Sequence, residues 1–280
     1  MKVASFETDG RRTYGVVQGD TVAEANSAWR ERFPDLRSVL AAGALPNLKS
    51  ECDDSALQLK DIKFLPVIPD PDKIMCVGVN YRPHVEEMGR DVPEKPVVFV
   101  RFAGSLVGNR QAIIRPGVSE QFDYEGELAV VIGRTARHVQ RADAYDYVAG
   151  FTCFMDGSIR DWQRHTIQFT PGKNFHRSGS IGPCLVTRDE VLSASALVLE
   201  TRVNGAIVQT GSLSELIFDI PFLIEYCSTF AELLPGDIIA TGTPGGVGAA
   251  RNPPVWLRNG DHVAVEIGEI GCLENTVRDE

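Results

Sequence analysis

Apolar residues recur along most of the chain in short runs bounded by Gly, Pro and Asn, and these runs predict strands. Three stretches between them predict helices: Pro83–Met88, Ser158–His165 and Ser214–Phe230. Many strands without regular alternation with helices favour an α+β, β-rich fold with a mixed core over a doubly wound sheet. The predicted strands lie within residues 73–79, 96–102, 112–116, 127–133, 147–155, 183–187, 197–211, 237–244 and 262–277.

A proline-rich segment, residues 64–73 (FLPVIPDPDK), indicates a division of the chain, because three prolines within six residues form a stiff, non-helical connector. Before this segment, short strands at 3–6 and 14–17 flank a turn, and helices begin near Ser27 and Leu36. We therefore expect a small N-terminal α/β domain at 1–65, a linker at 66–72 and a larger domain at 73–280.

Residues 122–133 (FDYEGELAVVIG) predict a strand that is covered on both faces, because both sets of alternating positions are apolar towards its end. Glu125 and Glu127 share one face at its start, about 7 Å apart. Two glutamates at a point where a strand emerges into water would be an ordinary solvated edge. A third carboxylate nearby would instead favour a hard divalent cation such as Mg²⁺ or Mn²⁺.

Composition narrows the class of protein. The 280 residues are 43% hydrophobic and 24% charged, which is ordinary for a globular protein. The N-terminus has no apolar segment of signal-peptide length, and the most apolar helical stretch is interrupted by charges and proline, so we expect a cytoplasmic protein with no membrane span. Six scattered cysteines without a C-x-x-C pair favour free, mostly buried thiols over a zinc site. The net charge of −10 argues against a nucleic-acid partner.

Several common catalytic patterns are missing from the sequence. The Gly-rich residues 242–254 (GTPGGVGAARNPP) end in prolines where a dinucleotide-binding unit needs a helix. P-loop, G-x-S-x-G and H-E-x-x-H motifs do not occur. Asp156 follows an apolar run directly before Gly157, where it is well placed to cap a helix. The same position also makes it available as the third carboxylate.

Six motifs occur in order along the chain: KIMCVGVNYRPHVEEMG, DYEGELAVVIGR, MDGSIRDWQ, GKNF, SELIFDI and LLPGDIIATGTPGGVG. Their order and spacing resemble the fumarylacetoacetate hydrolase superfamily, from about Lys73 to Val277. The resemblance implies a mixed β-sandwich or roll, usually a homodimer, in which 73–280 is the catalytic domain and the N-terminal part is variable. It also implies a Mg²⁺ or Mn²⁺ site with Glu125, Glu127 and Asp156 as the metal ligands.

The resemblance assigns further side chains to a bound 2-oxo acid. It places Lys173 beside the substrate, where the ammonium group stabilises the charge of an enolate. Arg160 and Gln163, one helical turn apart, would face the same ligand, and Thr243 would hydrogen-bond its carboxylate. Without the resemblance, the sequence would favour a surface lysine at Lys173, a solvated helix face at Arg160 and Gln163, and a structural turn at Thr243.

The motif NYRPHVEEMG supplies a candidate base. Pro83 suits a first helical turn and Gly89 a C-terminal stop, so His84 and Glu87 lie three residues apart on one face of a short helix. Hydrolytic members of the superfamily carry His and Glu at these positions, and such a carboxylate orients the imidazole and raises its basicity. An ion pair on the surface of the helix is the alternative.

The resemblance implies hydrolysis of a carbon–carbon bond in a 2,4-dioxo acid, an acylpyruvate such as fumarylpyruvate or maleylpyruvate, in the breakdown of aromatic compounds. In this scheme water activated by His84 attacks the C4 carbonyl and pyruvate is released. Oxaloacetate decarboxylases and 2-hydroxyhepta-2,4-diene-1,7-dioate isomerases or decarboxylases of the same superfamily are alternatives, and a non-catalytic ligand-binding member is another. Met155 and residues 176–183 (HRSGSIGP) depart from the common pattern, which leaves the acyl group open.

Overall fold

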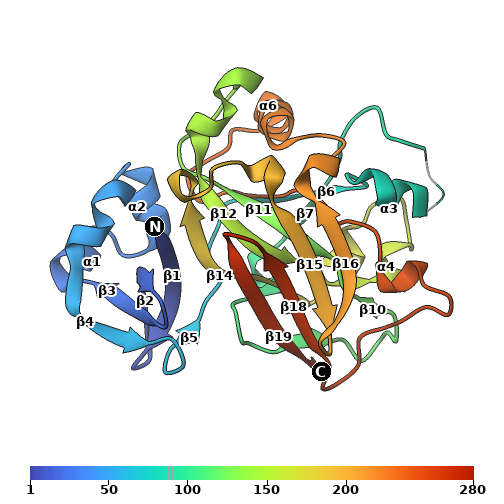
Figure 1. Ribbon diagram of the computed structural model, residues 1–280, viewed down its shortest axis with the longest axis horizontal. Coiled ribbons are helices and arrows are strands. Elements are labelled where there is room, and N and C mark those ends of the chain that lie inside the picture. Colours follow the sequence, from blue (N-terminus) through green and yellow to red (C-terminus); the bar gives the residue numbers. More distant parts are fainter. Residues whose placement is uncertain (88, 90) are drawn as a thin grey trace.

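The computed structural model describes residues 1–87, 89 and 91–280, and it confirms the predicted β-rich α+β fold (Figure 1). Its N-terminal part combines antiparallel strands with short helices. Asp9 and Gly10 both have positive φ, 49° and 72°, which suits the two-residue turn that joins the first hairpin. The elements of this part are β1 (Lys2–Thr8), β2 (Arg11–Gln18), β3 (Thr21–Ala25), α1 (Ser27–Arg32), α2 (Leu36–Ala41), η1 (Leu45–Glu51), β4 (Cys52–Gln58) and β5 (Lys63–Phe64).

Within the described chain, twelve strands form the main sheet, in the order β4-β3-β2-β1-β14-β12-β11-β17-β6-β7, with β5 beside β1 and β8 beside β14. The N-terminal strand β1 pairs with β14, with Val3 opposite Leu185, so the sheet runs across the proline-rich segment. The domain boundaries 1–65, 66–72 and 73–280 stay a prediction. The further strands of this sheet are β6 (Ile74–Gly78), β7 (Val97–Arg101), β8 (Leu106–Val107), β11 (Gly126–Ile132), β12 (Val148–Met155), β14 (Gly179–Thr187) and β17 (Ile238–Ala240).

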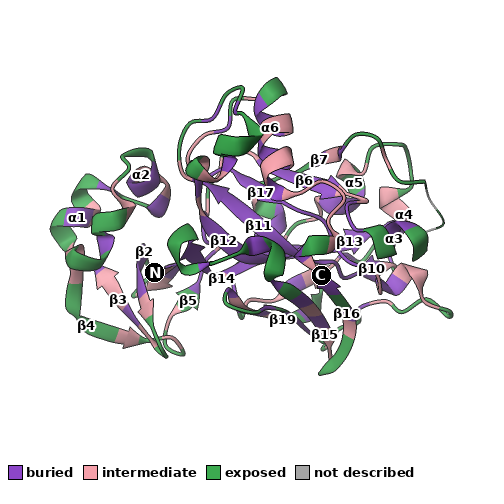
Figure 2. Cartoon of the chain, turned by 45° about the horizontal axis from the view of Figure 1, so that its top comes forward, coloured by how far each residue is buried: buried purple, intermediate pink, exposed green. Residues whose placement is uncertain are grey.

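Strand β11 is covered on both faces, as its apolar pattern predicts, and all of its residues are buried (Figure 2). Leu128 and Val130 pack in one cluster with Val265 from a second sheet. Ala129 and Val131 pack in a separate cluster on the opposite face. The second sheet has the order β16-β15-β18-β19-β9, with bounds β9 (Ile113–Arg115), β15 (Val198–Val203), β16 (Ala206–Ser212), β18 (His262–Ile267) and β19 (Gly271–Asp279).

The helix predicted at 158–165 is wrong at both ends, since the observed helix α4 covers only Arg160–Gln163. The two residues before it form β13 (Ser158–Ile159), which pairs with β10 (Phe122–Asp123). This pairing between distant segments holds the backbone extended where the local sequence favours a helix. Asp156 does not cap α4, because the N-cap residue is Ile159 and no side chain caps the helix.

The helix predicted at 214–230 also begins later than expected. Its regular part is α6 (Ile220–Phe230). The side chain of Asp219 accepts a hydrogen bond from the backbone N–H of Phe222 at 2.9 Å, and Pro221 lies in the first turn, so both residues favour a start at this point.

The helix predicted at 83–88 is observed as α3 (Arg82–Glu87), and its predicted last residue, Met88, lies outside the described residues. Over the part of the chain that the structure describes, no helix is long and apolar enough to cross a membrane. The remaining helices are η2 (Ala103–Ser105), η3 (Arg141–Tyr147), α5 (Thr170–Lys173), η4 (Arg188–Glu190), η5 (Ala194–Ala196), η6 (Leu213–Glu215) and η7 (Gly248–Ala250).

The cysteines in the described residues are free thiols, as predicted, and Cys76, Cys153, Cys184 and Cys227 are buried. Burial raises the pKa of the Cys227 thiol to about 12. A thiol with a raised pKa is a weak nucleophile and a weak metal ligand, so these side chains act as small apolar groups of the core.

Candidate functional site

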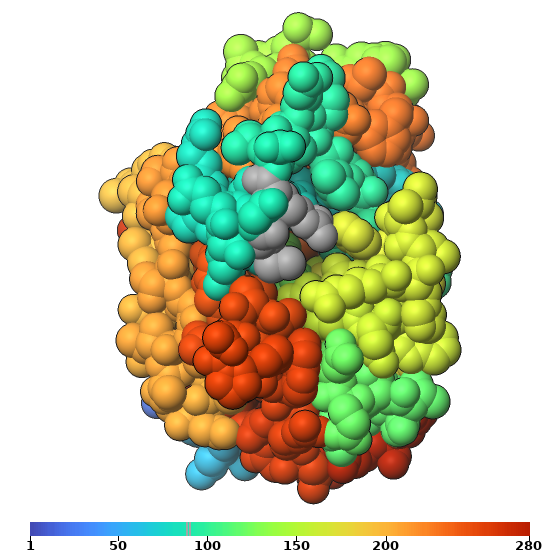
Figure 3. Space-filling model, turned by 90° about the vertical axis from the view of Figure 1, so that its right-hand side faces the viewer, coloured from blue at the N-terminus to red at the C-terminus, as the bar shows by residue number. Residues whose placement is uncertain are grey.

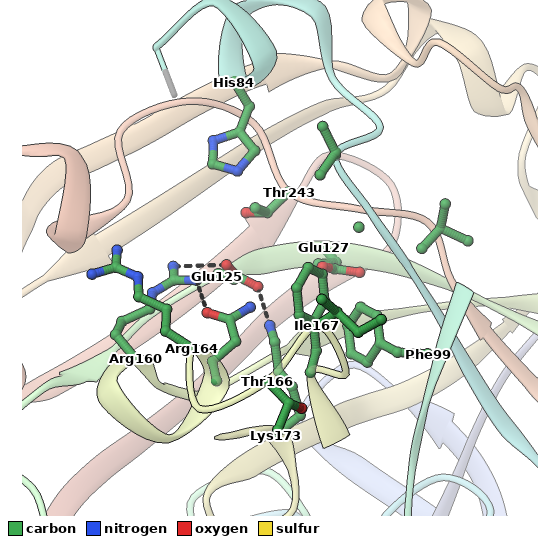
Figure 4. A pocket seen from close by; sticks show the side chains of 15 residues that line it. His84, Phe99, Glu125, Glu127, Arg160, Arg164, Thr166, Ile167, Lys173 and Thr243 are labelled. Carbon is green, nitrogen blue, oxygen red and sulfur yellow. Dashed lines mark hydrogen bonds and ion pairs between the residues drawn. The ribbon is translucent and has the colours of Figure 1, made fainter. Parts of the chain in front are cut away.

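The predicted site residues meet around one cavity of about 400 Å³, located where β11 begins and β12 ends (Figure 4). Figure 3 shows the face on which the segment containing α3, the segment following α4 and the Gly-rich loop around 245 come together. Asp156 and Glu87 contact the lining residues Lys173 and His84. The predicted residues that line the cavity are His84, Glu125, Glu127, Arg160, Gln163, Lys173 and Thr243.

Glu125, Glu127 and Asp156 form a buried carboxylate triad, with one oxygen from each lying within 4.8 Å of the others. Strand pairing explains the arrangement. Gly126 of β11 lies opposite Met155 of β12, so the residues that flank this pair converge at one edge of the sheet. The backbone N–H of Asp156 donates to the carbonyl oxygen of Glu125 at 2.8 Å and fixes this approach.

Three cationic side chains surround the carboxylate triad. Lys173 Nζ lies 2.5 Å from Glu125 Oε2 and 2.6 Å from Asp156 Oδ2. Arg160 Nη2 lies 2.7 Å from Glu125 Oε1, and Arg101 Nη1 lies 2.5 Å from Asp156 Oδ1. Glu125 and Asp156 therefore have close partners of opposite sign, which offset the cost of removing these charges from water, whereas Glu127 has no cationic side chain within 4.0 Å among the described residues.

The two glutamates have opposite pKa shifts. Burial alone would raise the pKa of Glu125, but the charges of Arg160 and Lys173 outweigh burial and lower that pKa to about 2. Burial raises the pKa of Glu127, and the negative charges of Asp156 and Glu125 raise it further. The hydrogen bond from Gly242 N–H to Glu127 Oε2, at 2.9 Å, only partly opposes this shift.

The lack of positive charge beside Glu127 fits a bound divalent cation. Glu127 lies beside the carboxylates of Glu125 and Asp156 and lacks the lysine contact that stabilises those two residues. A cation between the three carboxylates would supply the missing positive charge, and oxygen ligands of this kind suit Mg²⁺ or Mn²⁺. The donor set of this chain therefore agrees with the predicted metal.

His84 and Glu87 form the predicted pair on α3. His84 Nδ1 lies 3.3 Å from Glu87 Oε2, and both carboxylate oxygens of Glu87 accept from Gly246 N–H at 3.0 Å. Burial would raise the pKa of Glu87, but the hydrogen bonds from His84 and Gly246 together lower it. Figure 4 shows the imidazole directed into the cavity on the side of Thr243.

The structure holds Arg160 and Gln163 together, as their spacing predicts. Arg160 Nη1 donates to Gln163 Oε1 at 2.9 Å, and Arg160 Nε donates to Asp123 Oδ2 at 2.8 Å. Arg160 Nη2 lies close to Glu125, yet it is a buried donor with no well-directed hydrogen bond among the described residues. The guanidinium group of Arg160 thus lines the cavity and is held by Asp123, Gln163 and Glu125.

Thr243 lies on the cavity wall with its hydroxyl group engaged in the fold. The hydroxyl donates to the carbonyl oxygen of Gly126 at 2.9 Å and accepts from Gln209 Nε2 at 2.8 Å. The predicted hydrogen bond from this hydroxyl to a substrate carboxylate therefore requires it to rotate away from Gly126. The contact stays a prediction.

Arg101 and Asp123 take part in the site, although neither was predicted from the sequence. Arg101 is buried and pairs with Asp156, and Asp123 also accepts from the N–H groups of Gly248 and Ala249 at 2.8 and 2.9 Å. A charge inside an apolar run was the available signal for Arg101. The signal for Asp123 was its spacing of two residues from Glu125.

Comparisons with known proteins agree with this geometry. The fumarylacetoacetate (FAA) hydrolase C-terminal family model matches residues 73–278. The human protein oxaloacetate tautomerase FAHD2A, mitochondrial, is 44% identical over 223 residues, which are 79% of this chain and 71% of the relative. A putative HpcE protein from Mycobacterium smegmatis has a similar structure, with a TM-score of 0.89 and 34% identity over 100% of this chain and 99% of its own. Maleylpyruvate hydrolase from Sphingobium sp. SYK-6, in complex with manganese(II) ion and pyruvate, has a TM-score of 0.78 and 28% identity, with coverage of 100% and 99%.

The fold and the carboxylate site define a divalent-metal-dependent enzyme. The chain belongs to the fumarylacetoacetate hydrolase family. The prediction of a divalent-metal cofactor is therefore confirmed.

Proposed function

We propose that the protein interconverts the keto and enol forms of a 2-oxo dicarboxylic acid, with oxaloacetate as the leading substrate. The observation that carries the proposal is the 44% identity to a human oxaloacetate tautomerase over most of the chain. The cavity supports it, because cationic donors and a histidine surround the metal-binding carboxylates. This reaction differs from the predicted hydrolysis and belongs with the alternatives that act on oxaloacetate or isomerise a related acid.

Substrate binding follows from the charges of the site. Glu125, Glu127 and Asp156 would hold the divalent cation, which supplies Lewis-acid polarisation of a 2-oxo group when it is bound. Arg160 lines the cavity and brings positive charge to the place of the substrate carboxylate. Burial lowers the pKa of Lys173, but Asp156 and Glu125 outweigh it and raise that pKa, so the lysine stays charged and stabilises negative charge on the C2 oxygen.

Proton transfer is the role of His84. Because Glu87 offers an acceptor at Nδ1, the neutral imidazole keeps its hydrogen there and has its lone pair on Nε2. This nitrogen takes a proton from C3, the electrons of the C–H bond form the C2–C3 double bond, the C2 oxygen takes up a proton from water, and the imidazolium then loses its proton to the hydroxide so formed. The reverse sequence returns the enol to the keto form.

Acylpyruvate hydrolysis is the second candidate. It is favoured by the structural similarity to a maleylpyruvate hydrolase and by the His84–Glu87 pair, which suits the activation of water as well as it suits a carbon acid. In both reactions a 2-oxo acid is the small-molecule partner. The homodimer and the cytoplasmic location stay predictions.

The test follows the ultraviolet absorbance of enol-oxaloacetate as it converts to the keto form, with protein stripped of metal and then reloaded with Mn²⁺. Pyruvate release from oxaloacetate and from acylpyruvates is measured in parallel, because tautomerisation releases none. We expect loss of the enol to accelerate only with the loaded protein. Wild-type protein that releases pyruvate from an acylpyruvate but leaves the enol decay unchanged would contradict the tautomerase and support the second candidate.

Variants of α3 test the proposed base. His84→Ala and Glu87→Gln should slow tautomerisation on the order of 10²-fold, the usual contribution of a general base, while Mn²⁺ binding persists. The control is His262→Ala, which removes an exposed histidine of β18 in the second sheet. A wild-type rate in His84→Ala would show that the proton moves through another group.

A further inference from the structure

Arg164 extends the cationic side of the cavity towards its rim. It directly follows α4, and its backbone N–H donates to the carbonyl oxygen of Arg160 at 3.2 Å. Residues four apart on a helical turn have Cβ atoms about 5–6 Å from each other, so the side chains of Arg160 and Arg164 start from neighbouring points. Both line the cavity, and Figure 4 shows them on one side of it, across from Phe99 and Ile167.

The net charge of the inner part of the site, with a divalent cation bound, suits one substrate carboxylate. Four acidic side chains face three cationic ones there, so a bound divalent cation would leave this inner cluster with one net positive charge. That charge matches the C1 carboxylate of a 2-oxo acid but not a second carboxylate on the same molecule. The inner cluster comprises Asp123, Glu125, Glu127, Asp156, Arg101, Arg160 and Lys173.

Arg164 differs from Arg160 in its partners. Arg160 is buried and bonded to Asp123, whereas Arg164 is exposed and has no acidic partner within 4.0 Å among the described residues. The opposite wall contains Phe99, Ile167 and Phe169, which offer no charge to a carboxylate. A free cation thus lies on the cavity lining beyond the inner cluster.

We propose that Arg164 binds the second carboxylate of the substrate and so makes the enzyme selective for 2-oxo dicarboxylic acids over 2-oxo monocarboxylic acids. The inference rests on the proposed function, because it names the substrate class of the same site. An arginine presents two parallel N–H donors to a carboxylate, and its exposure keeps the cost of desolvation low when no dicarboxylate is bound.

The experiment measures binding and turnover in Arg164→Ala and Arg164→Lys. Mg²⁺-loaded protein is titrated calorimetrically with oxaloacetate, pyruvate and oxalate at low temperature, and the KM and kcat for enol-oxaloacetate are measured separately. Arg164→Ala should weaken oxaloacetate binding and raise KM about three- to tenfold, the size expected of an exposed charge contact, with kcat within about twofold. Pyruvate and oxalate affinities should not change, and Arg164→Lys should keep most of the selectivity.

The matched control is Arg82→Ala, which removes an exposed arginine on α3 that does not line the cavity and should leave the affinity ratio of oxaloacetate to pyruvate unchanged. An unchanged ratio in Arg164→Ala, or an equal loss in Arg82→Ala, would overturn the inference. The binding arm separates the two proposals. If the wild type fails to accelerate enol decay but Arg164→Ala still lowers the affinity for oxaloacetate relative to pyruvate, the tautomerase proposal fails. The role of Arg164 in binding a second carboxylate then stands.

Discussion

Glu127→Gln tests the metal site through stability. Burial and the charges of Asp156 and Glu125 raise the pKa of Glu127 in the metal-free protein. A carboxyl group whose pKa is raised on folding stabilises the fold fully below its ordinary pKa, and this contribution is lost as the pH rises through the raised value. Metal-free wild-type protein should therefore lose stability relative to Glu127→Gln as the pH rises from about 5.

Added metal should reverse the order of the two proteins. A cation at a hundredfold excess over its Kd stabilises the folded state by about 2.7 kcal/mol, and for a chain of this length Tm changes by about 2–4 °C per kcal/mol, so wild-type Tm should rise by about 5–11 °C. Removing a residue that hydrogen-bonds a metal ligand lowers the metal affinity about 10–100-fold. Removing a carboxylate that binds the metal directly should therefore lower the affinity by at least about 100-fold. The same Mn²⁺ concentration should then raise the variant's Tm by only about 1–2 °C.

The assay is thermal unfolding of Glu127→Gln and wild-type protein at several pH values, each with EDTA and with Mn²⁺. Glu269→Gln, which changes an exposed carboxylate, is the matched control and should follow the wild type. Equal Mn²⁺-dependent shifts in wild-type protein and Glu127→Gln would refute the assignment of Glu127 as a ligand. Parallel pH profiles without metal would refute the raised pKa.

Three further outcomes are expected. Arg101→Met leaves Asp156 buried without its guanidinium partner, so the free energy of unfolding in urea should fall by about 3–5 kcal/mol, and a loss below about 1 kcal/mol would show that the pair is dispensable. Gly157→Ala would place a Cβ 1.8 Å from the carbonyl oxygen of Ser178, so Tm should fall in this variant, and an unchanged Tm would contradict the rigid contact. Oxalate should inhibit competitively and should bind only metal-loaded protein, because its two carboxylates resemble a planar enolate; equal binding by calorimetry to metal-stripped protein would place it elsewhere.

Local sequence pattern predicted the parts of the fold that depend on local chemistry. The alternation in β11 predicted two buried faces, and the turn predicted between the strands at 3–6 and 14–17 is observed at Asp9 and Gly10. The start of α4 could not be predicted in this way, since it depends on the pairing of Ser158 with Asp123, which lies far away in the sequence.

The candidate site was predicted mainly from the family motifs. Spacing alone left Lys173 as a surface residue, whereas the fold buries it between Glu125 and Asp156. Arg101 was not predicted because its role depends on the end of β12, which the fold brings close to its side chain. Ion pairs between the ends of different strands depend on tertiary structure, which a local sequence pattern does not describe.

The buried charges alternate in sign from Arg101 through Asp156, Lys173, Glu125 and Arg160 to Asp123. The series holds three positive and three negative side chains, so any single neutral replacement leaves a net buried charge, and evolution or design can alter the series only through paired changes that restore neutrality. The exposed segment 164–168 borders the same cavity outside the series and can vary one residue at a time. Substitutions at the rim can therefore change the substrate specificity while the inner catalytic groups stay the same. Specificity and catalysis can then evolve at different rates.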